Sequence, residues 1–167
     1  MGSEGGIPDK GINYKPLAEG IFLDDHSNNI EITGNTVGNI RNSGLKMSNA
    51  NTVLVSGNTF YNASTSITLG NSNIGEDTRD ITIEDNQFFS RTTDQRSYAI
   101  KTYKNDILDL ANFDENYFFR PLGDEFSIEN QYYSKGKTYS AMDDLEQWKD
   151  KFGKDLNSIS NTVDIAT

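Results

Sequence analysis

Asp24, Asp25 and His26 form a dense polar cluster of three consecutive residues, and His26 is the only histidine. A carboxylate such as Asp24 can serve as a general acid or base, or can bind Ca²⁺ through its oxygens. The same residues, followed by Ser27, can instead form an ordinary turn, because Asp and Ser favour turns. Both interpretations stay open from the sequence. No metal ligands are assigned, and Ca²⁺ is the one cofactor that the residues suggest.

Further candidates lie at alternate positions of the segments 20–24, 44–48, 66–70 and 99–103. Side chains alternate across a strand, so the aliphatic positions should face inward and the others outward. The expected inward pairs are Ile21/Leu23, Leu45/Met47, Ile67/Leu69 and Ile100/Thr102. The outward positions then form two rows, one of Phe22, Lys46, Thr68 and Lys101, the other of Asp24, Ser48, Gly70 and Tyr103.

Aromatic, acidic and basic side chains on one exposed sheet suit a sugar-binding groove, and an ordinary solvated face is the alternative. A glycoside hydrolase needs two carboxylates about 5 to 10 Å apart. Asp24 has no acidic neighbour in its row, so a partner must come from a loop residue: Glu76, Asp77 or Asp94.

A lyase acting on uronates needs a cation at the substrate carboxylate and a base for the adjacent proton. Lys46 and Lys101 can fill these roles, as can the loop arginines Arg79, Arg91 and Arg96. The catalytic candidates are therefore Asp24 and Lys46. The substrate-binding candidates are Phe22, Lys101, Tyr103, Arg79 and Arg96.

A repeated phrase predicts the elements that position these residues. It reads NIEITGNTV at 29–37, NTVLVSGNTF at 51–60 and DITIEDNQF at 80–88, with a fainter copy ending at 118. Each copy is a β-branched strand followed by a polar turn with one Asn. The Asn residues are separated by 23, 28 and 30 residues, and periods of this size indicate a solenoid, here all-β with about four coils.

The recurring Asn is expected to be scaffold. A stacked column of Asn35, Asn58, Asn86 and Asn116 can donate and accept hydrogen bonds along the axis and satisfy the turns. An apolar column of Val37, Phe60, Phe88 and Phe118 should lie beside it.

Three segments follow from this pattern: an irregular 1–16, coils over 17–130, and a C-terminal cap over 131–167. Insertions at 71–79 and 90–97 should be loops. Phe126 and Ile128 suit one last strand, and Asp143 to Phe152 suits a capping helix with Trp148 on its apolar face. Residues 158–167 are expected to be a poorly fixed tail.

Composition excludes some partners. The net charge of −10 disfavours nucleic acid, and no apolar run approaches the roughly 20 residues that span a bilayer. There is no cysteine, so no disulfide or thiolate site exists, and no signal peptide follows Met1.

The phrases GIFLDD at 20–25 and NIEITGNTV at 29–37 resemble right-handed parallel β-helix proteins of the pectate-lyase-like superfamily. Segments 116–121, 145–148 and 153–158 are similar to the ends of many secreted bacterial β-helix proteins. The resemblance implies a polysaccharide or oligosaccharide as ligand and a secreted or cell-surface parent protein. It implies a polysaccharide lyase or glycoside hydrolase, or alternatively a non-catalytic carbohydrate-binding, adhesion or structural module. The absence of an N-terminal cap in the sequence suggests a C-terminal portion that continues from further upstream coils.

Overall fold

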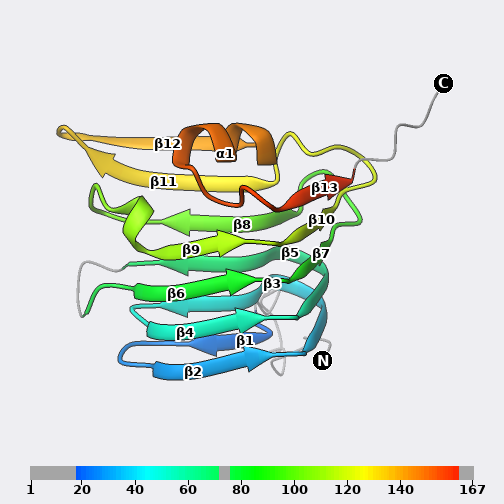
Figure 1. Ribbon diagram of the computed structural model, residues 1–167, viewed down its shortest axis with the longest axis horizontal. Helices are drawn as coiled ribbons and strands as arrows, with labels where there is room; N and C mark the ends of the chain where they lie inside the picture. The colour runs from blue at the N-terminus through cyan, green and yellow to red at the C-terminus, as the bar shows by residue number, and fades with distance from the viewer. Residues whose placement is uncertain (1–17, 72–75, 162–167) are drawn as a thin grey trace, which may run out of the picture.

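The computed structural model describes residues 18–71 and 76–161, and most of them lie in strands. Sheet B contains the first half of each repeated phrase. Its parallel strands stack in the order β2 (Asn28–Thr33), β4 (Asn51–Ser56), β6 (Arg79–Glu84) and β9 (Ala111–Asp114), as Figure 1 shows. The alternating β-branched residues of these segments suit a sheet that is buried on one face.

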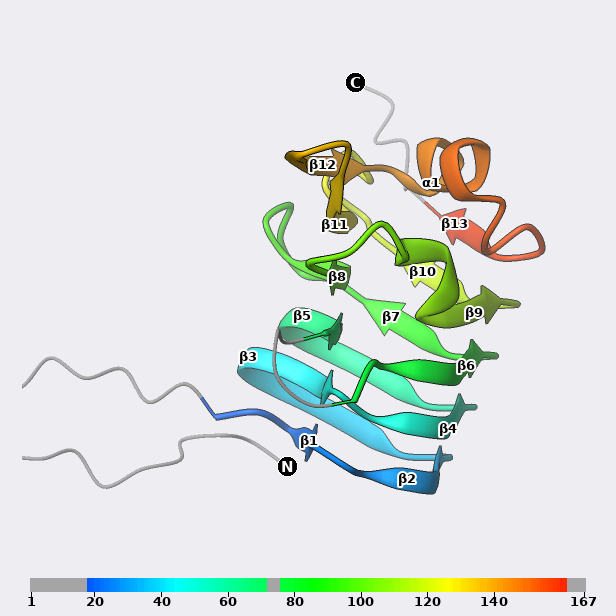
Figure 2. The same ribbon diagram turned by 90° about the vertical axis from the view of Figure 1, so that its left-hand side faces the viewer.

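Sheet A contains the remaining strands and curves around the interior (Figure 2). In the earlier repeats a single long strand makes the bend, because no insertion interrupts it. The later repeats are divided into shorter strands by the segments 90–95 and 120–127. The strands are β1 (Ile21–Leu23), β3 (Thr36–Ser48), β5 (Thr59–Gly70), β7 (Gln87–Phe89), β8 (Arg96–Lys101), β10 (Tyr117–Phe119), β11 (Ile128–Ser134), β12 (Lys137–Asp143) and β13 (Ile159–Asn161).

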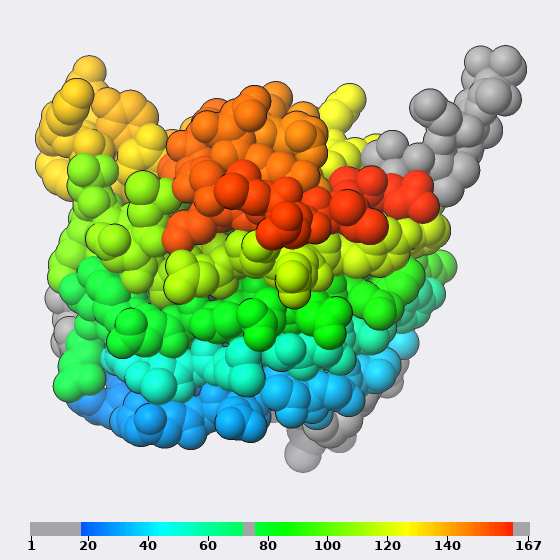
Figure 3. All heavy atoms as spheres, viewed as in Figure 1, coloured from blue at the N-terminus to red at the C-terminus, as the bar shows by residue number. Residues whose placement is uncertain are grey.

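All pairings in both sheets are parallel except that of β11 with β12. β5 pairs with β7 through its first half and with β8 through its second half. Each repeat therefore lies directly on the one before it, and the space-filling view shows the repeats as stacked bands (Figure 3). Positions of the same kind in successive repeats become neighbours.

The expected Asn column is confirmed. The Oδ1 atom of Asn58 accepts from the backbone N–H and Nδ2 of Asn35, at 2.9 and 3.1 Å. Asn86 Oδ1 accepts from Asn58 in the same way, and Asn116 Oδ1 accepts from Asn86. Asn58, Asn86 and Asn116 are buried, and their Nδ2 atoms also donate to strand carbonyls. The column closes the turns between the sheets.

The apolar column beside the Asn residues is confirmed as well. Phe60, Phe88 and Phe118 have no exposed surface, and Val37 lies at the start of the column with 6% exposed. The ring centroid of Phe88 lies 5.6 Å from that of Phe60 and 5.3 Å from that of Phe118. The column runs through the interior of the stacked repeats.

One register prediction is wrong. Tyr98 lies opposite Ile67, and Ile100 lies opposite Leu69, so the inward pair of β8 is Tyr98/Ile100 rather than Ile100/Thr102. Tyr98 fits inside because its ring packs 5.3 Å from Phe88. Thr102 follows β8 and is buried, with its hydroxyl donating to Asp106 Oδ1 at 2.5 Å.

The repeat continues beyond Phe119, where the sequence predicted at most a single short strand from Phe126 and Ile128. β11 pairs in parallel with β8, and Ile128 is fully buried opposite Tyr98. Phe126 precedes the strand and is 49% exposed. β12 then folds back on β11 as an antiparallel hairpin, which the repeat pattern could not show because it belongs to no repeat. A short 3₁₀ helix, η1 (Ile107–Asp109), leads into β9.

The single described α-helix, α1 (Leu145–Phe152), lies within the expected range 143–152. Asp144 is its N-cap, accepting from the backbone N–H of Gln147, and Gly153 ends it in the left-handed conformation. Trp148 is buried edge-on against Phe113 of β9, with ring centroids 5.8 Å apart. The helix therefore packs on the last strand of sheet B.

The prediction of a loose tail from residue 158 is wrong for its first part. β13 pairs in parallel with β10, placing Ser160 opposite Phe118, because Asp155 and Ser158 hold the approach to this strand through hydrogen bonds. Residues 162–167, and the irregular segment predicted at 1–16, lie outside the described residues. None of the helices in the described part of the chain is long and apolar enough to cross a membrane.

Candidate functional site

The corrected register changes the outward rows of sheet A. The first row contains Phe22, Lys46, Thr68, Ala99 and Glu129. Lys101 lies in the second row, with Ser48, Gly70 and Gln131. The ionic contacts add Glu19 and Arg96 to this surface. We call the set the charged face: Glu19, Phe22, Lys46, Arg96, Lys101 and Glu129.

At one end of the charged face, Lys46 lies between Glu19 and Phe22. Its Nζ atom is 3.6 Å from Glu19 Oε1 and 5.0 Å from the centre of the Phe22 ring. Glu19 also accepts at 2.7 Å from Asn42 Nδ2 and from the backbone N–H of Ser43. The 14% exposed carboxylate is thus held by the middle of β3, while Phe22 remains 48% exposed.

At the other end, two cations share one carboxylate. Arg96 Nη1 and Lys101 Nζ lie 3.2 and 3.0 Å from the two oxygens of Glu129. Glu129 is 17% exposed, whereas the Arg96 and Lys101 side chains are 37% and 46% exposed. Arg96 Nε is itself buried without a hydrogen-bond partner among the described residues. This cluster carries a local charge of +1 in a chain of net charge −10.

Asp24 and His26 lie in an exposed turn at the end of β1. The backbone N–H of Ser27 donates to Asp24 O at 3.0 Å, and His26 has a left-handed backbone with φ of 64°. Asp25 accepts from Asn49 Nδ2 at 2.7 Å. Tyr103 lies beyond β8 and is 61% exposed. These residues occupy the turn edge of sheet A, and the turn interpretation describes Asp24 to Ser27 well.

Arg79 lies in a separate ionic network at the start of β6. Its Nη2 atom is 2.6 Å from Asp106 Oδ2 and 3.2 Å from Asp77 Oδ2. Lys104 Nζ lies 2.6 Å from Asp77 Oδ1. This hydrogen bond is the main reason that the pKa of Asp77 lies below its usual value. The network ties the 76–79 segment to the turn after β8. It does not join Arg79 to the charged face.

The structure does not place two carboxylates together on the charged face. Glu19 contacts Lys46, whereas Glu129 lies three strand positions further along the row, past Thr68 and Ala99. Three steps of about 4.8 Å separate the backbones by roughly 14 Å. Among residues 18–71 and 76–161, no group of three or more His, Cys, Asp or Glu side chains is placed to hold a metal ion.

A second group of exposed side chains was missed by the sequence interpretation. Tyr61, Phe89 and Phe119 are register neighbours on the outer side of β5, β7 and β10, and Tyr117 lies beside them. We call these four residues the aromatic strip. The sequence did hold a signal for the strip: each of its aromatic residues at 61, 89 and 119 directly follows an inward Phe. Because side chains alternate along a strand, a residue next to an inward one faces outward.

The family model described as the right handed beta helix region matches residues 13–132. The chain belongs to this family. No curated protein and no solved structure shows a significant match. Membership is consistent with a carbohydrate-related or structural β-helix module, and it assigns no reaction. The parallel stacking and the Asn column are the structural counterpart of the matched repeats.

Proposed function

We propose that this β-helix is the carbohydrate-binding part of an extracellular protein and that its charged face binds a uronate-containing glycan. The proposal includes a parallel solenoid of about four coils, closed at its C-terminal end by α1 and the β11–β12 hairpin. The observation that carries it is the cluster of Arg96 and Lys101 around the single carboxylate of Glu129. A ligand carboxylate can compete for these two cations.

The supporting argument is local electrostatics. Two half-exposed cations with one carboxylate between them retain one uncompensated positive charge. Arg96 Nε is buried, so a ligand would contact the outer nitrogens of this guanidinium and Lys101 Nζ. The guanidinium group binds planar carboxylates well because its donors match their geometry. Phe22 at the opposite end offers an exposed ring for the apolar face of a sugar.

Catalysis is the second candidate, as part of a polysaccharide lyase or glycoside hydrolase. Hydrolysis is less well supported, because Glu19 and Glu129 are separated along the row by more than the usual 5 to 10 Å between catalytic carboxylates. Lyase chemistry has the residue types it needs in Lys46 and the Arg96–Lys101 pair, but these lie on β3 and β8, two strand steps or about 10 Å apart. The carboxylate and the abstracted proton of one uronate lie on neighbouring carbons, so catalysis ranks below binding here.

The test is affinity electrophoresis in gels containing polygalacturonate or alginate. The double variant R96Q/K101Q should lose retardation by either polymer. The control is K135Q/K137Q on the β11–β12 hairpin, which makes the same change of net charge at two exposed lysines. Equal retardation of the two double variants would contradict the proposal. Absorbance of an unsaturated product in the same mixtures would identify turnover and favour the lyase.

A further inference from the structure

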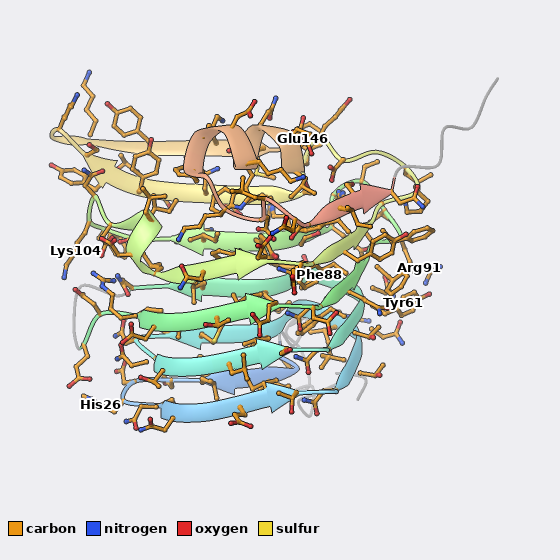
Figure 4. All side chains as sticks on the ribbon, in the orientation of Figure 1. His26, Tyr61, Phe88, Arg91, Lys104 and Glu146 are labelled. Carbon is orange, nitrogen blue, oxygen red and sulfur yellow. The ribbon has the colours of Figure 1, made fainter. Side chains whose placement is uncertain are left out.

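The side chains of the aromatic strip carry no charge, in a chain of net charge −10. Two outward rows cross β5, β7 and β10: Thr59, Gln87 and Tyr117 in one, and Tyr61, Phe89 and Phe119 in the other. Neither row contains an Asp, Glu, Lys or Arg over these strands. Tyr61 is 41% exposed and the other three rings are partly exposed. Figure 4 shows Tyr61 and Arg91 projecting from the same edge of the molecule, with Phe88 inside.

Three rings of the strip, those of Phe89, Phe119 and Tyr117, are in contact. The centroid of Phe89 lies 5.5 Å from that of Phe119 and 6.4 Å from that of Tyr117. Tyr61 extends the row by one repeat, and its ring lies over Gly38, where an added Cβ would contact Cδ1 at 3.6 Å. The rings of Tyr61, Phe89 and Phe119 thus come from three successive strands, about one strand spacing apart.

A ladder of amides runs beside the rings. Asn62 Nδ2 donates to Asn39 Oδ1 at 2.8 Å, and Gln95 Nε2 donates to Asn62 Oδ1 at 2.9 Å. Each amide nitrogen has two hydrogens, and these contacts use one of them. Asn39 is exposed, and Asn62 and Gln95 are partly exposed, so the ladder can offer further donors to a ligand.

Arg120 fixes the loop that carries Gln95. Its guanidinium is 1% exposed and donates to Ser90 Oγ at 2.9 Å and to Gln95 O at 2.6 Å. Gln95 Oε1 in turn accepts from the backbone N–H of Arg91 at 2.6 Å. The loop is therefore ordered before any ligand arrives, and preorganised groups bind with a smaller loss of entropy.

We propose that the aromatic strip and its amide ladder bind an extended, neutral polysaccharide, at a site separate from the charged face. Pyranose rings have apolar C–H faces that stack on aromatic side chains, and a rim of hydroxyls that amides can both donate to and accept from. Rings on three successive strands, with the amide ladder beside them, suit an extended polymer. The absence of charge from the two rows favours neutral sugars over uronates.

The experiment uses the whole chain in gels that contain a neutral soluble glycan: glucomannan, xyloglucan or mixed-linkage β-glucan. Y61T, F89T and F119T are made singly and together, because Thr already occupies outward positions of sheet A at Thr36 of β3 and Thr59 of β5. The matched control is Y133T, which removes a 44% exposed ring from β11. Circular dichroism and a thermal melt establish that each variant is folded.

Retardation by at least one neutral glycan is expected for the parent, for Y133T and for R96Q/K101Q. Each substitution in the strip should weaken it roughly tenfold, the scale of losing one aromatic anchor. Y61T is the decisive single variant, because its exposed side chain makes a folding defect the least expected. Retention of full binding by Y61T and the triple variant would overturn the proposal, as would no retardation of the parent by any of the glycans. Sedimentation tests whether the strip is instead a contact between two copies of the chain. A parent that sediments as a dimer, with the strip variants sedimenting as monomers, would assign the surface to a second copy and would also overturn the proposal.

Discussion

Asp155 accepts a hydrogen bond from Asn116 Nδ2 at 3.1 Å, so a carboxylate ends the column of stacked amides. The next Asn of the column would be expected where Asp155 lies. The carboxylate also accepts from Trp148 Nε1 at 3.0 Å and from Ser158 Oγ at 2.6 Å. Asp155 therefore links the last repeat, the helix α1 and the approach to β13 through one fully buried group.

Replacing Asp155 by Asn should destabilise the fold at neutral pH. The substitution keeps the size of the side chain but places an amide N–H₂ at one of two oxygens that both accept hydrogen bonds, Oδ1 from Asn116 and Ser158 and Oδ2 from Trp148. A buried donor left without an acceptor costs about 1 to 3 kcal/mol. Urea unfolding should show a lower midpoint with an unchanged slope. The control is D109N at an exposed position, which should change the unfolding free energy by less than about 0.5 kcal/mol. Equal stability of the two variants would contradict the role assigned to Asp155.

The pH dependence of this effect has a definite sign. Burial raises the pKa of Asp155, although its hydrogen bonds with Ser158, Asn116 and Trp148 act in the opposite direction. When folding raises the pKa of an acid, that acid increases the free energy of unfolding, and the increase is complete at pH values below the pKa of the unfolded chain, near 3.9. That stabilisation is lost as the pH rises through the folded pKa, because the folded protein binds more protons in this window.

The measured quantity is the difference in unfolding free energy between the parent and D155N, which cancels the titration of the other groups. We expect this difference to decrease as the pH is raised from about 4 toward neutrality. A difference that increases with pH would mean that the hydrogen bonds outweigh burial and that folding lowers the pKa of Asp155.

The Asn column should be most sensitive in its middle. Asn86 Nδ2 donates to Val55 O and Glu84 O at 2.9 Å, and its Oδ1 accepts twice from Asn58. N86A leaves these buried groups without partners and should cost about 3 kcal/mol of unfolding free energy. N35A is the matched control, because Asn35 is exposed at the start of the described column, and it should cost about 1 kcal/mol or less. Chemical denaturation measures both. Similar losses would show that the column does not depend on burial.

Strand alternation predicts opposite outcomes for two adjacent residues. Phe88 has no exposed surface and contacts the rings of Phe60, Phe118 and Tyr98, so F88A should cost about 3 to 5 kcal/mol. Phe89 faces outward, so F89T should change the stability far less and act on glycan binding instead. Thermal melts of the two variants separate these effects. A larger loss of stability for F89T would contradict the assignment of faces.

The interior was predictable because its residues recur. Asn at 35, 58, 86 and 116, and Phe at 60, 88 and 118, occupy the same place in each repeat, and identical neighbours one strand apart impose the same contact each time. The register of β8 was not predictable from the pattern. The insertion 90–95 changes the length of that repeat, and Ala99–Ile100 resembles Ser66–Ile67 closely enough to suggest an alignment two residues away from the true one.

The charged face was only partly predictable for a related reason. Phe22, Lys46 and Lys101 lie on recognisable strands, but their acidic partners do not. Glu19 precedes β1, and Glu129 lies in β11, beyond the last recognisable phrase. The strand that carries Glu129 is specified by its pairing with β8 rather than by any repeat. Asp155 is likewise a single residue without a counterpart, so only the structure reveals it as the end of the Asn column.

Glu129 is the only acidic residue in the described part of the chain that forms ion pairs with both Arg96 and Lys101. In the proposed site Glu129 competes with a ligand carboxylate for Arg96 and Lys101, so E129Q should bind polygalacturonate more tightly than the parent. A gain of roughly threefold to tenfold corresponds to about 0.7 to 1.4 kcal/mol, the scale of releasing partly exposed ion pairs.

The same variant should also depend more steeply on salt, because its site has a net charge of +2 instead of +1, and screening weakens charge attraction. Titrations at low and at physiological ionic strength measure both quantities. E19Q at the other end of the charged face is the control, since it removes one acidic charge without touching Arg96 or Lys101. Weaker binding by E129Q would mean that Glu129 positions the two cations for the ligand rather than competing with it, and an equal gain in E19Q would reduce the effect to net charge alone.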